Sequence, residues 1–167
     1  MDSDKYFKIF KKKLQKNPQK YIKDYIKIYK KVQKSSAIYD GEPVDFLYQP
    51  MFYDIKEVKK LNNLIQKLFN ILEKVITRFK KDPEFRKYFG FPDLMEKLIL
   101  KDPGYGVNIP VARFDIFYNY DKILFCELNT DGSSAMNEAR VLENLFQQSI
   151  IFKDMNEKFK FYRSELF

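Results

Sequence analysis

The chain has 167 residues, of which 45% are hydrophobic and 17% aromatic, and a formal net charge of +8. This composition excludes a disordered chain, and no stretch approaches the roughly 20 uncharged apolar residues of a membrane span. The N-terminus shows no apolar signal segment, so we expect a cytoplasmic protein. One cysteine, Cys126, and no histidine exclude an intramolecular disulfide, a Cys/His zinc site and a Ser-His-Asp triad.

The first 34 residues are rich in lysine and predict a pair of amphipathic helices. We expect one helix from about Asp4 to Lys16 and a second from Pro18 to about Lys34, with Asn17 as its N-cap. Two interpretations of the lysines stay open. They form a solvated helix face, or they form a surface for nucleic acid or an acidic membrane.

Residues Ser35–Pro50 lack helical periodicity and predict an extended connector. Asp54 and Glu57 resemble a capping box, and the apolar periodicity behind them predicts a long helix that ends near Lys81. Two short helices are predicted to follow, over residues 82–90 and 92–102.

The pattern then changes to that of strands. Val111–Asn119 and Lys122–Asn129 predict two strands around a short turn, and helical periodicity returns at Met136. The expected fold class is therefore α+β, with a small antiparallel β unit packed on helices. We expect residues 1–34 to form the helical pair and residues 35–167 to form the α+β domain.

Strand alternation gives each of these two strands an apolar face. The faces consist of Ala112, Phe114, Ile116 and Tyr118 in the first strand, and of Leu124, Cys126 and Leu128 in the second. The two faces coincide if the loop holds an odd number of residues, most simply 120–122. In that register Cys126 is a buried, inert thiol.

The same register gathers Arg113, Asp115, Glu127 and Asn129 on the opposite face. Carboxylate and amide oxygens suit a hard cation such as Mg²⁺, which also binds phosphate oxygens, and an arginine fork suits a phosphate or a carboxylate. The alternative is structural. Arg113 then pairs with one of the carboxylates, Asn129 is a turn former and Ser134 is an ordinary N-cap.

The order of these residues resembles the motif of the glutathionylspermidine synthase family. The resemblance rests on Arg113-x-Asp115, then Glu127-x-Asn129-x-Asp131 and Glu138. It covers residues 113–138 closely, and a looser likeness to the pre-ATP-grasp region takes in Glu42-Pro43, Pro50 and the predicted long helix. The family has a circularly permuted ATP-grasp fold and belongs with the ATP-dependent carboxylate–amine ligases.

The resemblance implies ATP and Mg²⁺ as cofactors, with a peptide-like carboxylate and an amine acceptor as substrates. By it, Asp115, Glu127 and Asn129 hold Mg²⁺, and Arg113 and Asn129 contact the nucleotide. Arg113 would also be catalytic, because it stabilises the transferring phosphoryl group, and Ser134 would bind the peptide substrate. The resemblance also leads us to expect the N-terminal, pre-ATP-grasp part of a longer ligase, inactive by itself.

A second function from a different class is a non-catalytic basic module that binds nucleic acid or acidic surfaces through the lysine-rich helices. It predicts an affinity that falls steeply with salt. Nucleic acid is the less favoured partner, because few of the 31 basic residues are arginine.

Overall fold

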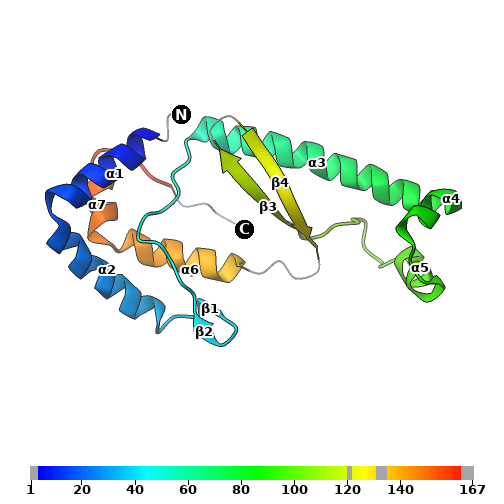
Figure 1. The fold of residues 1–167 in the computed structure, drawn as a ribbon, viewed down its shortest axis with the longest axis horizontal. Helices are drawn as coiled ribbons and strands as arrows, with labels where there is room; N and C mark the ends of the chain where they lie inside the picture. Colours follow the sequence, from blue (N-terminus) through cyan, green and yellow to red (C-terminus); the bar gives the residue numbers. More distant parts are fainter. Residues whose placement is uncertain (1–3, 120–121, 131–134, 163–167) are drawn as a thin grey trace. The chain divides into compact units, whose positions relative to one another are not determined.

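The computed structural model describes residues 4–119, 122–130 and 135–162, and its fold is α+β (Figure 1). Helices make up most of the described chain, and the strands form two sheets of two strands each, β1–β2 and β3–β4. The chain divides into two compact units. Unit 1 consists of the described residues within 1–54, 117–124 and 132–167, and unit 2 of those within 55–116 and 125–131.

Unit 1 begins with the two lysine-rich helices, and both predictions are confirmed. Helix α1 spans Asp4–Lys16 and α2 spans Pro18–Val32. The side-chain oxygen of Asn17 accepts a hydrogen bond from the backbone N–H of Lys20 at 3.3 Å, as an N-cap does. Proline at the next position has no N–H that needs a partner, so the sequence by itself starts α2 here.

The connector after α2 contains a small hairpin that the sequence analysis did not predict. Strands β1 (Ile38–Tyr39) and β2 (Glu42–Pro43) pair antiparallel, with Tyr39 opposite Glu42. The two residues between them, Asp40 and Gly41, have φ values of 51° and 81°. Positive φ at both positions is the geometry of a tight hairpin turn, and Asp-Gly is the sequence that best tolerates it.

Two C-terminal helices complete unit 1. Helix α6 (Met136–Gln147) matches the predicted return of helical periodicity, whereas α7 (Ile150–Asn156) was not predicted as a separate helix. The buried hydroxyl of Ser149 caps α7, because it accepts a hydrogen bond from the N–H of Phe152 at 3.1 Å.

The hydrophobic core of unit 1 joins both ends of the sequence. Its buried residues are Phe10, Tyr21, Phe52, Ile151 and Met155. They come from α1, from α2, from the segment before α3 and from α7, and Figure 1 shows the blue and orange helices side by side. Helices α1 and α2, which form the expected helical pair, thus pack with α7.

Unit 2 is built on the long helix α3, Ile55–Lys81, whose bounds match the prediction. Two short helical segments follow it, as expected. They are α4 (Pro83–Arg86), which continues into the 3-10 turn η1 (Lys87–Phe89), and α5 (Asp93–Leu100).

Arg86 ties the end of α3 to α5. Its Nε donates to Glu96 at 2.6 Å, and its Nη1 donates to the backbone carbonyl of Phe79 at 3.0 Å. The ring of Phe79 is buried beside this contact and meets the ring of Phe89 edge-on, with centroids 5.0 Å apart. One guanidinium therefore satisfies a carbonyl at the helix end that would otherwise lack a partner.

The remaining sheet consists of β3 (Arg113–Asn119) and β4 (Lys122–Asn129), close to the predicted strands. Both strands contribute to the two units, because Phe117–Leu124 groups with unit 1 and the remainder with unit 2. Four residues of the predicted motif, Arg113, Asp115, Glu127 and Asn129, lie in the parts of the strands that belong to unit 2.

Candidate functional site

The first half of the predicted motif forms a close ion pair. Arg113 Nε lies 2.8 Å from one carboxylate oxygen of Asp115, and its Nη2 lies 3.3 Å from the other. Both side chains are about one-third exposed or more, so the pair contributes little to stability by itself. The guanidinium of Arg113 donates from two nitrogen atoms to the two carboxylate oxygens, an arrangement that also suits a phosphate group.

The register of the two strands follows from a ring contact. The rings of Phe114 and Phe125 meet edge-on, with centroids 6.1 Å apart. Side chains on opposite faces of a two-stranded sheet point away from each other, so this contact requires both rings on one face. Along β3, Arg113 and Asp115 are the neighbours of Phe114 and therefore lie on the other face. Along β4, Glu127 and Asn129 lie two and four residues from Phe125 and share its face. The two halves of the motif are thus on opposite faces of the sheet.

The exposure of the other strand residues agrees with this register. Phe117 is 66% exposed and Leu124 is 58% exposed, as expected for the outer face of the sheet. Cys126 lies on that face and is exposed, so the prediction of a buried thiol is wrong. The strands are separated by two residues, 120 and 121, and not by the three that would make the apolar faces coincide.

The predicted ligands on β4 lie in different surroundings. Glu127 is exposed and Asn129 is half-buried. The Nδ2 atom of Asn129 is buried and has no hydrogen-bond partner among the residues that the structure describes. Over the same residues, no three acidic or cysteine side chains gather closely enough to hold a metal ion. The structure thus brings Arg113 and Asp115 together, but it does not add Glu127 and Asn129 to them.

The motif residue Asp131 and the expected substrate-binding residue Ser134 lie outside the described residues, so the role of Ser134 stays a prediction. Glu138, the last motif residue, is half-buried in the first turn of α6.

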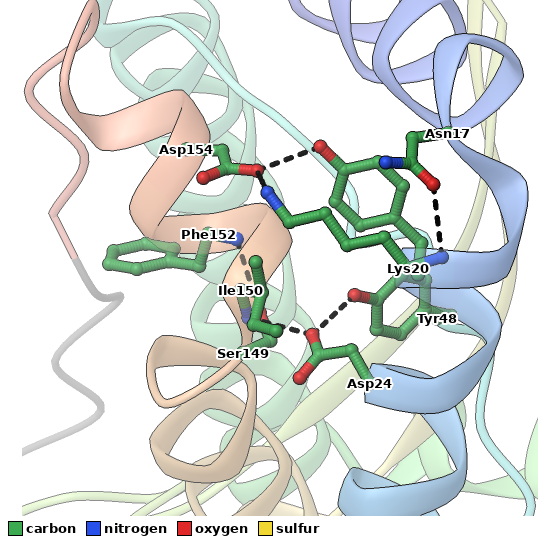
Figure 2. Close-up of polar contacts among 9 residues, drawn as sticks. Asn17, Lys20, Asp24, Tyr48, Ser149, Ile150, Phe152 and Asp154 are labelled. Carbon is green, nitrogen blue, oxygen red and sulfur yellow. Dashed lines mark hydrogen bonds and ion pairs between the residues drawn. The ribbon is translucent and has the colours of Figure 1, made fainter.

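A buried polar network in unit 1 holds the residues that the sequence analysis missed (Figure 2). Asp24 is buried, and its Oδ2 accepts hydrogen bonds from the hydroxyl of Tyr48 at 2.6 Å and from the N–H of Ile150 at 2.7 Å. Ile150 is the first residue of α7, so a carboxylate from α2 satisfies an N–H that has no partner within its own helix.

A second carboxylate links the same helices. Asp154 accepts hydrogen bonds from the ammonium group of Lys20 and from the hydroxyl of Tyr21 at 2.8 Å. Burial disfavours the charged form of Asp154, but the bonds from Lys20 and Tyr21 outweigh it and hold its pKa below the usual value. Burial and the bond to Asp154 raise the pKa of Tyr21 to about 12.

We expect Tyr21→Phe to lower the free energy of unfolding by about 1 kcal/mol at neutral pH, because it removes this hydrogen bond. In the unfolded chain Tyr21 titrates near its ordinary pKa of 10.0, and in the folded chain near about 12. The contribution of Tyr21 is therefore fully present below pH 10 and is lost as the pH rises through the folded value. Urea unfolding of both proteins across this interval should show their difference shrinking. A difference that stays constant with pH would contradict the assignment.

The lysines of α1 and α2 are mostly exposed, as the prediction of a solvated helix face requires. Lys20 and Lys31 are bound within unit 1, to Asp154 and to Gln148 respectively. Among the helices of the described chain, none is both long and apolar enough to cross a membrane.

Comparison of the chain with protein-family models, with curated proteins and with solved structures finds no match.

Proposed function

We propose that this chain contributes the Mg-phosphate and substrate-binding residues of an ATP-dependent carboxylate–amine ligase that resembles glutathionylspermidine synthase. The observation that carries the proposal is the position of the motif. Its Arg-x-Asp and Glu-x-Asn halves fall on two neighbouring strands, β3 and β4, and Arg113 is already held beside Asp115. ATP, a peptide carboxylate and an amine acceptor would be its substrates, which is consistent with a cytoplasmic protein.

The donor types suit the proposed metal, because Asp115, Glu127 and Asn129 offer the hard oxygen ligands that Mg²⁺ prefers. Arg113 would bind and orient the phosphate that is transferred, as an arginine fork does. The proposal further requires Glu127 and Asn129 to come to the face of Arg113. A shift of β4 by one residue against β3 would achieve this, because a one-residue slip exchanges the two faces of a strand.

Calorimetric titration of the chain with Mg-ATP tests the proposal. We expect binding heat from the unaltered chain, and a loss of affinity of about tenfold or more in Glu127→Gln and in Asp115→Asn. Glu157→Gln is the matched control, since Glu157 is an exposed carboxylate that follows α7. It should leave the affinity unchanged.

A second measurement locates the metal. Mn²⁺ added with ATP should broaden the amide resonances of β3 and β4, and both Asp115→Asn and Glu127→Gln should weaken that broadening if the two halves of the motif meet at one ion. The proposal is refuted if the unaltered chain gives no heat, or if Glu157→Gln reduces the heat as much as the motif variants do. It is also refuted if the broadening persists unchanged in Glu127→Gln.

A further inference from the structure

Helix α2 presents two parallel rows of exposed side chains. The first row is basic and consists of Lys23, Lys27, Lys30 and, just beyond the end of the helix, Lys34. The second row lies beside it and consists of Ile22, Ile26 and Tyr29. Spacings of three and four residues align the members of each row along the helix.

The other sides of α2 are covered within unit 1. Asp24 and Ile28 are buried against the core. On one flank Lys20 and Lys31 are bound to α7 and to the residue that follows α6. On the other flank the rings of Tyr25 and Tyr29 contact the ring of Phe46, with centroids 5.7 Å and 6.4 Å apart. The basic row, Ile22 and Ile26 occupy the arc that remains, and Tyr29 lies at its edge, with one part of its ring against Phe46 and another exposed.

The charge of this face is of one sign. Between Lys5 and Tyr39 the sequence has a single carboxylate, Asp24, and no arginine. Asp24 is buried on the opposite side of α2. Among the residues that the structure describes, no ion pair joins a carboxylate to the four lysines of the basic row. The face therefore complements a surface that carries many negative charges.

The second row is apolar, and it decides between anionic partners. Ile22 is 49% exposed, Ile26 is 45% exposed and Tyr29 is 40% exposed. Aliphatic side chains gain by entering a hydrocarbon layer, and tyrosine favours the boundary between that layer and water. Nucleic acid is instead contacted by arginine forks and by flat rings that stack on bases, and α2 has no arginine.

We propose that this face of α2 docks on a membrane surface that contains anionic phospholipids. Ile22, Ile26 and Tyr29 enter the boundary between head groups and acyl chains, while the lysines extend their ammonium groups to the lipid phosphates. The helix lies along the surface and does not cross the membrane. This inference is independent of the proposed ligase function, because it uses none of the residues of β3 and β4.

Vesicle flotation with the 167-residue chain tests the charge of the face. We expect binding to phosphatidylcholine vesicles that contain phosphatidylserine, weaker binding at higher salt, and little binding to phosphatidylcholine alone. Changing Lys23, Lys27, Lys30 and Lys34 together to glutamine should reduce partitioning by about tenfold or more. The control changes four exposed lysines of α3 to glutamine, Lys59, Lys60, Lys67 and Lys74, and should alter partitioning by no more than about twofold.

A tryptophan reporter tests the apolar row directly. The chain has no tryptophan, so Ile26→Trp places one fluorophore on the proposed face, and Ile71→Trp places one at an exposed position of α3. Phosphatidylserine vesicles should shift the emission of Ile26→Trp to shorter wavelength and leave Ile71→Trp unchanged. This reporter retains every lysine, so it does not depend on the folding of the lysine variants.

Three outcomes would overturn the inference. The first is a folded chain that does not bind the phosphatidylserine vesicles. The second is an equal loss in the two lysine variants, which would mean that net charge alone is sensed. The third is displacement from vesicles by duplex RNA together with an unshifted Ile26→Trp emission, which would identify the face as a nucleic-acid surface.

Discussion

Replacement of Phe10 by alanine should lower the free energy of unfolding of unit 1 by about 3–5 kcal/mol, the range for a fully buried phenylalanine. Phe10 is buried in the hydrophobic cluster of unit 1, together with Tyr21, Ile151 and Met155. Its ring lies 6.2 Å from that of Phe52, centroid to centroid. The helices around it come from both ends of the sequence, so the cavity cannot close by the movement of one local segment.

Urea unfolding followed by circular dichroism measures this loss. Leu47→Ala is the control, because Leu47 is 84% exposed and its truncation should change the free energy by less than about 0.5 kcal/mol. Equal losses in the two variants would show that Phe10 does not lie in the core of unit 1.

Replacement of Asp24 by alanine should have the second large effect and lower the free energy of unfolding by about 3 kcal/mol, because it leaves two partly buried donors without an acceptor. These donors are the hydroxyl of Tyr48 and the N–H of Ile150, both within 2.7 Å of the same carboxylate oxygen. Asp24→Asn should cost less, since its amide oxygen still accepts a hydrogen bond.

A double-mutant cycle of Asp24→Ala with Tyr48→Phe measures the interaction energy between Asp24 and Tyr48. We expect the two changes to be non-additive by about 1 kcal/mol or more, because each removes the same hydrogen bond. Asp45→Ala is the matched control, since Asp45 is an exposed carboxylate of the connector. Additive losses from Asp24→Ala and Tyr48→Phe would contradict the direct bond between them.

Most helices could be predicted from the sequence because their signals are local. Asn17-Pro18 starts α2, the apolar periodicity defines α3 up to Lys81, and Asp82-Pro83 starts α4. Each signal depends on residues within one or two turns of the helix. The hairpin of β1 and β2 was not predicted, although it has such a signal too, the Asp40-Gly41 pair.

The candidate site shows why pairing between strands is harder to predict than the strands themselves. Both strands were predicted from alternation, but the apolar pattern alone favoured the wrong register. Phe117 and Leu124 are apolar and yet exposed, so apolar residues occur on both faces of this sheet. Where both faces carry apolar residues, the pattern specifies the register only weakly.

Local patterns in the sequence predict most of the helices and the strands β3 and β4, exclude histidine chemistry and a Cys/His zinc site, and make α1 and α2 rich in lysine. Which residues meet depends on the tertiary structure. It buried Asp24 in the middle of a basic helix, where Tyr48 and Ile150 satisfy it, and it separated Arg113 from Glu127 across a sheet that carries both. The difference follows from how far along the chain each interaction acts. Caps and periodicity act over a few residues, whereas burial and strand register depend on partners that lie tens of residues away in the chain.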